Sequence, residues 1–482
     1  MLEENAYDAR IPRMISSYFG DVAEVFSNIR HHLNNKAVVA IDIGDSCYGG
    51  VHVPVDRLLT ACLQNLGFEE KDVTELRKRR SKGGSILKQT LLIYSYIGNG
   101  NRFYTADINR WEKDWKQFKA QLPHQQNPYA KRNWGHSLHS LCSYPGKMKP
   151  AIAHHLVKIF VPEHGRLLDP FAGVGTIPFE AALQGKTSYG FEISQAAFVI
   201  ASGKVQLHDR GKCDEIIADL KEYILSNKPT AKELEYANVF GFNGKVFEYY
   251  NPDTLNEVML ARRYFVDKPA QTPEEFFVLS SLLHILHGNR PYALSRRSHP
   301  ITPYKPTGPA EYRSLIQRLR EKVERGLTEQ LSLNFKPGKI IFQDATSWWP
   351  QEIDELDAII TSPPFFDSTR FYLANWLRLW FCGWNPADFE GRPLGFVEER
   401  QKKNFDVYVP ILRQAREHLK KDGVLVMHLG KSEKCNMSEK LLELGKIWFR
   451  NSEIFEESVS HCESHGIRDK GTVSSHQYLV MS

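Results

Sequence analysis

Two turns in the sequence combine residue types that suit the binding of a nucleotide-like ligand. The first turn, residues 169–176, reads Asp-Pro-Phe-Ala-Gly-Val-Gly-Thr and follows an apolar run. Gly173 and Gly175 let the backbone turn sharply and let a ligand approach where a side chain would clash. The helix expected after the turn offers free N–H groups and the positive end of its dipole. The pattern predicts a strand, a glycine turn and a helix, either as an ordinary connection or as a nucleotide site.

An acid and a double proline favour the nucleotide site. Residues 187–192 predict a second short strand that ends at Glu192, whose carboxylate can accept hydrogen bonds from both hydroxyls of a ribose. Residues 357–361 predict a buried strand that leads into Ser-Pro-Pro-Phe at residues 362–365. The paired prolines fix φ and remove two N–H donors. This second turn is therefore expected to be rigid and to present carbonyl oxygens as acceptors.

Together these two turns resemble the S-adenosylmethionine (SAM) site and the catalytic motif of the DNA amino-methyltransferases. The resemblance covers roughly residues 131–482. Family members methylate N4 of cytosine or N6 of adenine, and those with Ser-Pro-Pro-Tyr or Ser-Pro-Pro-Phe are mostly N4-cytosine enzymes. The resemblance therefore implies SAM as the cofactor and cytosine N4 as the target. The catalytic residues that it implies are Ser362, Pro363, Pro364 and Phe365, where Phe365 replaces the commoner Tyr.

The resemblance also implies which residues hold SAM. In the family, a segment like the one at residues 143–147 closes over the methionine end, with Lys147 or Ser143 near the carboxylate. Residues 339–345 predict another buried strand that ends in an acid. In the family an acid at this place accepts a hydrogen bond from the adenine amino group, and Asp344 is the candidate. The expected cofactor-binding residues are Tyr144, Lys147, Asp169, Phe171, Gly173, Gly175, Thr176, Glu192, Ile193 and Asp344.

Methyl transfer to an exocyclic amine needs positioning more than it needs a nucleophile. The amine is a poor nucleophile because its lone pair is delocalised into the ring, and direct displacement requires neither a cysteine nor a metal. The Ser362 hydroxyl and the Pro363 carbonyl suit the role of acceptors for the two N–H groups, and Phe365 offers an aromatic face to the base. Positioning can lower the barrier by on the order of 7–11 kcal/mol at best. A base in a duplex must first be flipped out, which costs about a few kcal/mol.

Composition sets broad limits on the protein. The 482 residues suggest about three domains, and 42% hydrophobic with 25% charged residues is typical of a globular chain. A net charge of +5 permits nucleic acid as a partner without requiring it. The seven cysteines include no Cys-x-x-Cys pair, which argues against a disulfide framework or a zinc site and fits a reducing cytoplasm. No membrane-spanning run or signal peptide is apparent, so a cytoplasmic protein is expected.

An internal repeat links the two ends of the chain. Residues 30–46 align without a gap on residues 416–432, and each copy predicts a helix end, a polar turn and a buried strand that ends at Gly. Each copy then predicts a helix, a basic loop and a final apolar strand, as in the rear half of a methyltransferase sheet. Residues 1–97 are therefore predicted to be an appended half-unit without its front half. A tandem remnant, a piece that pairs with a separately encoded front half, self-association and a circular permutation are alternatives, as is chance similarity.

The remaining segments complete the predicted organisation. Residues 98–130 are polar and predict a linker, and residues 131–203 with 338–482 form the expected catalytic domain. Residues 204–337 predict a mainly helical insertion, which is the candidate DNA-recognition region. A basic, proline-stiffened loop in this insertion suits contact with phosphates and a base edge. Its candidate DNA-contacting residues are Arg296, Arg297, His299, Tyr304 and Lys305.

The predicted fold class is α/β: a Rossmann-like class I methyltransferase sheet with helices on both faces, a helical insertion and an N-terminal half-unit. The predicted function is SAM-dependent methylation of a flipped base in double-stranded DNA, with cytosine N4 as the target, in a restriction–modification or defence setting. Adenine-N6 methylation of DNA is the nearest alternative. An RNA methyltransferase stays open because residues 169–181 also resemble RNA guanine-N2 enzymes. A non-catalytic DNA-binding subunit that needs a partner is the alternative from another class.

Overall fold

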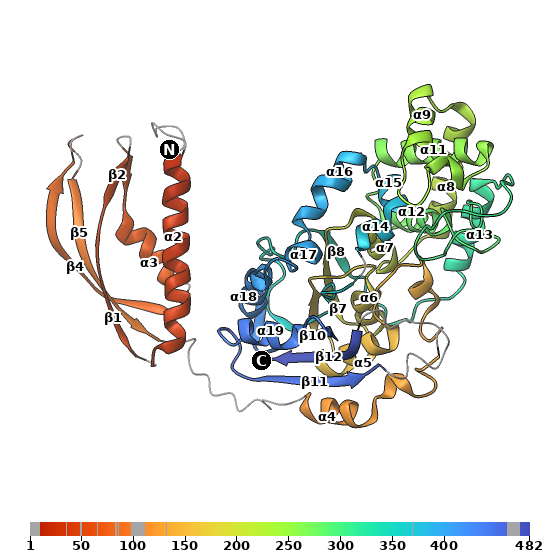
Figure 1. Cartoon of the computed structure of the whole chain (residues 1–482). Coiled ribbons are helices and arrows are strands. Elements are labelled where there is room, and N and C mark those ends of the chain that lie inside the picture. The colour runs from red at the N-terminus through yellow and green to blue at the C-terminus, as the bar shows by residue number, and fades with distance from the viewer. Residues whose placement is uncertain are drawn as a thin grey trace. The chain divides into compact units, whose positions relative to one another are not determined.

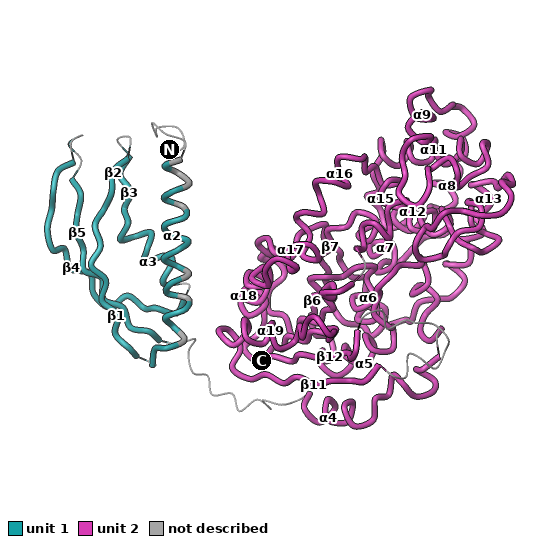
Figure 2. Tube along the Cα trace, viewed as in Figure 1, with its two compact units in different colours: residues 1–107 teal, residues 108–482 magenta. Residues whose placement is uncertain are grey.

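A computed structural model gives the arrangement of the chain (Figure 1). It describes residues 10–97 except 35, 49, 50, 65, 82, 83 and 85, residues 111–459 except 132 and 369, and residues 473–482. The chain divides into two compact units, residues 1–107 and residues 108–482 (Figure 2). No helix among the described residues is long and apolar enough to cross a membrane.

Unit 1 is a small sheet with helices packed on it. Its elements are α2 (Arg10–Ile29), η1 (Arg30–His32), β1 (Val38–Gly44), β2 (Ser46–Tyr48), β3 (Val51–Val53), α3 (Val55–Gln64), β4 (Phe68–Arg80) and β5 (Ile86–Tyr96). The main sheet has the order β1-β5-β4, with both pairs antiparallel. Leu59 and Leu63 of α3 pack with Leu92 and Tyr94 of β5, and apolar residues of α2 and β1 join this core.

Unit 2 contains a seven-stranded sheet in the order β11-β12-β10-β9-β6-β7-β8. Its strands are β6 (Arg166–Asp169), β7 (Thr187–Glu192), β8 (Lys339–Phe342), β9 (Leu356–Thr361), β10 (Leu419–Ser432), β11 (Ser452–Ser458) and β12 (Val473–Met481). The five strands from β10 to β8 pair in parallel, and β12 runs antiparallel between β10 and β11. The α/β fold class predicted from the sequence is confirmed.

Helices cover both faces of this sheet because successive residues of a strand point to opposite sides. Val424 and Val426 of β10 face a core built with α5, whereas Leu425 and Met427 face a core built with α18 and α19. The helices outside the insertion are α4 (Glu112–Gln121), α5 (Pro150–Phe160), α6 (Thr176–Leu183), α7 (Gln195–Lys204), α14 (Phe371–Ala374), α15 (Trp376–Phe381), α16 (Pro386–Gly391), α17 (Val397–Arg400), α18 (Val409–His418) and α19 (Met437–Gly445).

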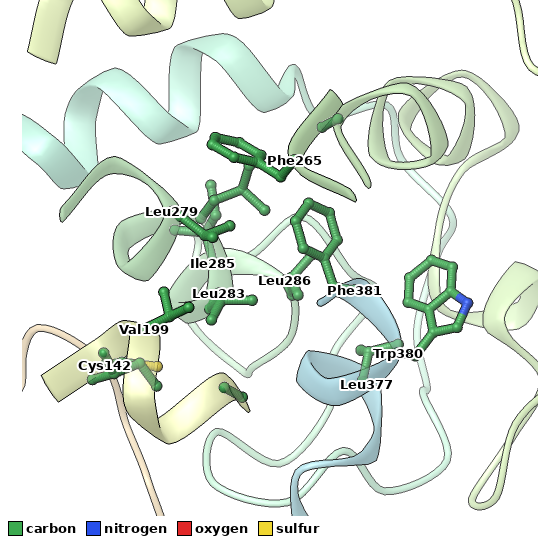
Figure 3. Close-up of a cluster of buried hydrophobic side chains, with 14 of the residues drawn as sticks. Cys142, Val199, Phe265, Leu279, Leu283, Ile285, Leu286, Leu377, Trp380 and Phe381 are labelled. Carbon is green, nitrogen blue, oxygen red and sulfur yellow. The ribbon is translucent and has the colours of Figure 1, made fainter. Parts of the chain in front are cut away.

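The segment between β7 and β8 is mainly helical. Its helices are α8 (Arg210–Ser226), α9 (Ala231–Val239), α10 (Val246–Tyr249), α11 (Pro252–Asp267), α12 (Pro273–Ile285) and α13 (Leu315–Gly326). Their apolar side chains form one buried cluster that also takes in α7 and α15. Figure 3 shows part of this cluster, in which Phe265 and Leu279 of the insertion belong to the same core as Val199 of α7 and Phe381 of α15. The insertion therefore shares its core with the helices that flank the sheet.

Two local expectations differ from the structure. Part of the predicted linker, residues 98–110, lies outside the described residues, but the rest is not irregular throughout. Trp115 and Phe118 of α4 are buried against α5 and β12, and this tertiary packing overrides the polar composition of the segment. The strand before Asp344 was predicted to be buried. It is instead the edge strand β8, where Phe342 is half exposed.

Candidate active site

A cavity of about 320 Å³ lies where the carboxyl ends of the central parallel strands meet. This edge of an open α/β sheet is where ligands commonly bind, because the loops that follow the strands converge there. Of the residues predicted from the sequence, thirteen line the cavity: Tyr144, Lys147, Asp169, Phe171, Gly173, Thr176, Glu192, Ile193, Asp344, Ser362, Pro363, Pro364 and Phe365. The structure thus brings the two predicted turns together, although Thr176 and Ser362 are 186 positions apart in the sequence.

Gly175 does not line the cavity, but its backbone shape explains why glycine is needed. It precedes α6 with φ of 72°, and an added Cβ would lie 3.0 Å from the Cβ of Ala201. Gly173 has φ of 52° and no atom within 4 Å of the equivalent position, so this part of the turn is open. The buried ammonium of Lys204 donates a hydrogen bond to the Val174 carbonyl and braces the turn from behind.

Asp169 holds two strand ends together. Its Oδ1 accepts hydrogen bonds from the Thr361 hydroxyl at 2.6 Å and from the Phe171 N–H at 3.0 Å. These contacts join the end of β6 to the end of β9 and to the start of the glycine turn. Burial raises the pKa of Asp169 to about 7. Although the Asp169 carboxyl borders the cavity, these two hydrogen bonds indicate that it holds the glycine turn and the end of β9 in position.

Glu192 ends β7 at the cavity wall. The Ser194 N–H donates to its Oε1 at 2.7 Å, which fixes the carboxyl orientation. Burial raises the pKa of Glu192 to about 8, and the Asp169 charge adds to this effect, while backbone N–H donors oppose it. Burial also raises the pKa of Tyr144, with a contribution from the Glu192 charge, so these two side chains share one environment. A ligand hydroxyl that donates to Glu192 would favour its ionised form.

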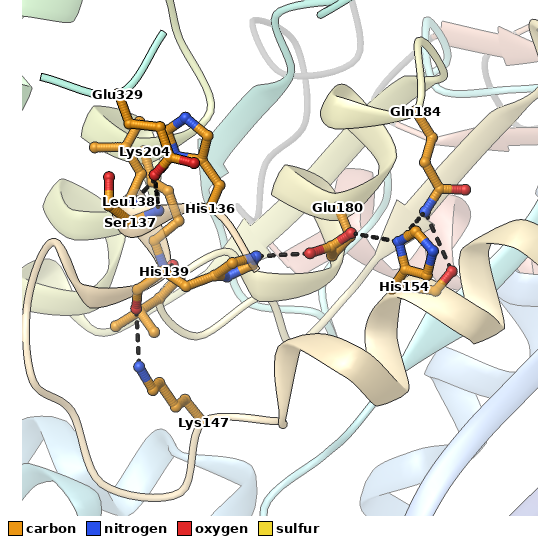
Figure 4. A network of polar contacts seen from close by, with 11 residues as sticks. His136, Ser137, Leu138, His139, Lys147, His154, Glu180, Gln184, Lys204 and Glu329 are labelled. Carbon is orange, nitrogen blue, oxygen red and sulfur yellow. Dashed lines mark hydrogen bonds and ion pairs between the residues drawn. The ribbon is translucent and has the colours of Figure 1, made fainter. Parts of the chain in front are cut away.

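The segment that contains Tyr144 and Lys147 is anchored by a buried polar network (Figure 4). Glu180 of α6 contacts His139 Nε2 at 2.7 Å and His154 Nδ1 at 3.1 Å. Burial opposes ionisation, but the hydrogen bonds with the two histidines hold the pKa of Glu180 below its ordinary value. Lys147 donates to the His139 carbonyl at 2.8 Å, so its ammonium already has one partner. The network therefore fixes this wall of the cavity to the helix after the glycine turn.

Asp344 follows β8 and lies at the cavity wall. Its Oδ1 accepts hydrogen bonds from both the backbone N–H and the hydroxyl of Thr346, at 2.8 and 2.9 Å. These two donors hold Oδ1 in place. They leave Oδ2 as the oxygen that can accept from a ligand.

The Ser-Pro-Pro-Phe turn is braced by groups far away in the sequence. Ser362 Oγ lies 3.3 Å from His428 Nδ1, and burial lowers the pKa of His428 well below its ordinary value. The Pro364 carbonyl accepts from the Gln401 side chain at 3.0 Å. No donor to the Pro363 carbonyl is recorded among the described residues. The turn thus presents the Pro363 carbonyl and the Ser362 hydroxyl, which contacts the neutral side chain of His428.

Glu398 is a cavity residue that the sequence analysis missed. It lies in α17 at the cavity wall and is 7% exposed. Its Oε2 accepts a hydrogen bond from the Phe371 N–H at 3.2 Å. Its Oε1 is buried and has no hydrogen-bond partner among the described residues. Burial raises the pKa of Glu398 to about 7. Nothing in the spacing around Glu398 marks it, whereas His428 had a visible signal, since it interrupts the apolar run of β10.

The predicted DNA loop is only partly available for contact. Arg297, His299, Tyr304 and Lys305 are exposed. Arg296 is different, because its guanidinium donates to the Gly308 carbonyl at 2.8 Å and to the Glu248 carbonyl at 3.2 Å. The bond to Glu248 ties the loop to α10, which gives Arg296 a structural role, and its contact with DNA stays a prediction.

The residues around the cavity fit SAM. Acceptors for the ribose and the adenine amino group are present in Glu192 and Asp344, and the unpartnered oxygen of Glu398 fits a cationic ammonium. Gly173 leaves open space beside the turn. No group of three metal-ligating side chains was found among the described residues.

Comparison with known proteins gives a family match. The N6/N4 methyltransferase family model, described as DNA methylase, matches residues 6–202. The match begins in unit 1 and runs through the glycine turn to α7. The family similarity therefore includes unit 1, whereas the resemblance seen in the sequence motifs begins near residue 131.

Two curated relatives are type II methyltransferases. M.MjaII of Methanocaldococcus jannaschii is 24% identical over 162 residues, which is 33% of this chain and 30% of the relative. M.ScaI of Streptomyces caespitosus is 34% identical over 64 residues, which is 13% of this chain and 21% of the relative. The chain thus spans less than a third of the length of either relative.

Solved structures give weaker similarities. A TehB-like SAM-dependent methyltransferase from Corynebacterium glutamicum is 10% identical, over 78% of this chain and 98% of that one, with a TM-score of 0.27. An rRNA methylase from Streptococcus thermophilus is 8% identical, over 70% and 97%, also with a TM-score of 0.27. The fold assignment therefore rests on the strand order of the sheet and not on these similarities. The family model and the curated relatives confirm that this chain resembles the SAM-dependent DNA amino-methyltransferases of the N6/N4 family.

Proposed function

We propose that the protein transfers the methyl group of SAM to the exocyclic amine of a flipped base in DNA, with cytosine N4 as the target. One observation carries this proposal: the predicted cofactor residues and the Ser-Pro-Pro-Phe turn line the same cavity. A methyl donor held by the first set would therefore lie next to acceptors supplied by the second set. The choice of cytosine rests on the serine at position 362, as in the family members that carry Ser-Pro-Pro.

Three acids give the cofactor a defined orientation. Glu192 would accept from the ribose hydroxyls and Asp344 from the adenine amino group. Glu398 would pair with the ammonium of the methionine end, which supplies its unpartnered Oε1 with a donor. Glu192 ends β7, Asp344 lies in the loop after β8 and Glu398 lies in α17, so the three line different parts of the wall. When bound, SAM supplies an electrophilic methyl group for direct displacement.

The Ser-Pro-Pro turn would position the target amine. The free Pro363 carbonyl accepts one N–H of the amine, and the Ser362 oxygen accepts the other. In the tautomer of His428 with an unprotonated Nδ1, the Ser362 hydroxyl donates to that nitrogen and keeps its own lone pairs for the amine. Because burial keeps His428 neutral, its role is to orient the hydroxyl rather than to act as a base. Preorganised acceptors of this kind can contribute several kcal/mol to transition-state stabilisation.

The deciding experiment is product analysis with the full chain. The protein is incubated with SAM carrying an isotopically labelled methyl group and with DNA of mixed sequence, which is then digested to nucleosides for mass spectrometry. Labelled N4-methylcytosine is the expected product. N6-methyladenine would keep the proposed mechanism and overturn the choice of base. Product on RNA alone would overturn DNA as the substrate. A Pro363→Ala protein that still binds SAM serves as the matched negative control.

A further inference from the structure

The two copies of the internal repeat fold alike but differ in what borders them. In unit 1 the strand order is β1-β5-β4, and in unit 2 the matching order is β10-β12-β11, with antiparallel pairing throughout. On its other side β10 pairs in parallel with β9, the strand that leads into Ser-Pro-Pro. Among the described residues β1 has no such neighbour and ends its sheet (Figure 2). The position that β9 takes beside β10 is therefore open beside β1.

Side-chain exposure points to the same missing neighbour. The alignment of residues 30–46 with 416–432, extended back along the helix, pairs Val25 of α2 with Ile411 of α18 and Ile29 with Ala415. Val25 and Ile29 are 52% and 37% exposed, whereas Ile411 and Ala415 are 2% and 0% exposed. In unit 2 those two residues are buried in a cluster with Leu356 and Ile359 of β9. Unit 1 thus exposes apolar residues that a β9-like strand covers in the second copy.

The glycine at the end of each strand gives a third sign. A Cβ added at Gly430 of β10 would lie 2.5 Å from the Phe365 ring, which follows Ser-Pro-Pro and packs on this glycine. At Gly44, the matching residue of β1, the nearest atom to an added Cβ is the Lys88 carbonyl oxygen at 3.8 Å. Among the described residues, no side chain takes the corresponding space at Gly44. The open position therefore fits a strand that continues into a turn carrying an aromatic residue.

We propose that the edge of β1 with Val25, Ile29 and Gly44, here called the free-edge surface, binds a partner polypeptide that carries a methyltransferase front half. The partner contributes a strand that runs parallel to β1, is apolar on both faces and ends in a proline turn followed by an aromatic residue. The β9 of this chain cannot serve within its own molecule, because it already pairs with β6 and β10. The family match across residues 6–202 supports the view that unit 1 is a methyltransferase piece. This proposal concerns an interaction surface and does not depend on the proposed reaction.

The test uses the full chain and a peptide that stands in for the partner strand. The peptide copies residues 354–368, which include β9 and its turn, and a scrambled peptide of the same composition is the reference. Hydrogen–deuterium exchange with mass spectrometry then reports which amides the peptide protects. Protection of residues 38–44 by the first peptide alone is expected. No protection there, or equal protection by the scrambled peptide, would overturn the proposal, as would protection of β4 in place of β1.

Matched variants separate the free-edge surface from general edge pairing. Val25→Lys should weaken peptide binding by at least about tenfold, since burial of a valine contributes about 1.5–3 kcal/mol. Gly44→Leu should do the same by filling the space meant for the aromatic ring. Val73→Lys places the same charge on β4, at the opposite edge, where Val73 is similarly exposed, and should leave binding unchanged. Because Val25 and Val73 are exposed, both lysine variants should unfold at the wild-type temperature.

Light scattering on the full chain tests whether a second copy of this chain binds the free-edge surface. A dimer that Val25→Lys abolishes, with no protection by the β9 peptide, would show that a second copy of this chain covers the surface and would overturn the proposal. A monomer that binds the peptide at β1 would support it. Methyl-transfer activity is measured separately, so failure of one proposal stays distinguishable from failure of the other.

Discussion

Glu398 gives a sharp test of how the cavity holds its cofactor. Its carboxyl is buried, its Oε1 has no partner among the described residues, and burial raises its pKa to about 7. Loss of a hydrogen bond to a charged group costs about 1.5–3 kcal/mol. Glu398→Gln keeps the shape and the acceptor for the Phe371 N–H but removes the charge. The variant should therefore bind SAM about 10- to 100-fold more weakly at pH 7.5.

The same residue predicts a pH dependence. A carboxyl with a pKa near 7 is about one-tenth ionised at pH 6 and about three-quarters ionised at pH 7.5, so wild-type affinity for SAM should rise about eightfold over this range. An α-amino group with a pKa of about 7.7–8.0 is still about 60–75% protonated at pH 7.5, so loss of the ligand's charge offsets only a small part of the rise. The Glu398→Gln protein should lose the part of the rise that Glu398 contributes, and any rise that remains reports Glu192, whose pKa burial raises to about 8.

Isothermal titration calorimetry measures both effects. 5′-Methylthioadenosine, which retains the adenosine part and lacks the amino acid, should bind the wild type and the variant equally. Glu399→Gln is the matched control, because Glu399 is the neighbouring acid and pairs with Arg370 and Lys402 instead of lining the cavity. Unchanged SAM affinity in Glu398→Gln would refute the reasoning. Equal weakening of both ligands would show that the change had damaged the cavity itself.

Four further predictions concern the other parts of the site and the basic loop. Pro363→Ala keeps the backbone carbonyl but frees φ, so the acceptor is no longer held in place and the transfer rate should fall by about 100-fold while the dissociation constant of SAM, from calorimetry, stays within about twofold; lost SAM binding would contradict the assigned role. Glu192→Ala should raise that constant about 10- to 100-fold, and an unchanged value would place the ribose partner elsewhere. Arg297→Ala combined with Lys305→Ala should weaken DNA binding and reduce the slope of log affinity against log salt by about 2, measured by fluorescence anisotropy. Arg296→Ala should instead lower the unfolding temperature, because it breaks two bonds to backbone carbonyls; a changed salt slope at normal stability would return it to the DNA surface.

Local patterns in the sequence predicted the fold and much of the site. The glycine turn and Ser-Pro-Pro each follow a strand, and the ends of neighbouring parallel strands meet at one edge of a sheet. The resemblance to the DNA amino-methyltransferases grouped Gly173, Glu192 and Ser362 in one site, and the shared edge of the sheet explains why they line the same cavity. The sheet of unit 1 has the strand order that the repeat predicts, since β1-β5-β4 corresponds to β10-β12-β11.

Contacts between distant segments lay beyond the sequence. Glu398 reaches the cavity only through the packing of α17, and its orphan oxygen has no counterpart in spacing or composition. Arg296 looked available for phosphates because its neighbours are basic, yet its guanidinium satisfies two backbone carbonyls. The helix α4 was missed because its surface is charged, while Trp115 and Phe118 are buried by residues more than thirty positions away.

The shared core of the insertion constrains attempts to transplant recognition between enzymes. Arg378 of α15 is fully buried and donates to the carbonyls of Leu283 in α12 and Ile301 in the basic loop. A chimaera cut at residues 204 and 337 would leave this guanidinium facing foreign backbone and would split the apolar cluster in two. The transferable unit is therefore larger than the insertion, because it must include α15, which follows the Ser-Pro-Pro-Phe turn in the sequence. Any exchange of the insertion would therefore also replace part of the scaffold around the cavity.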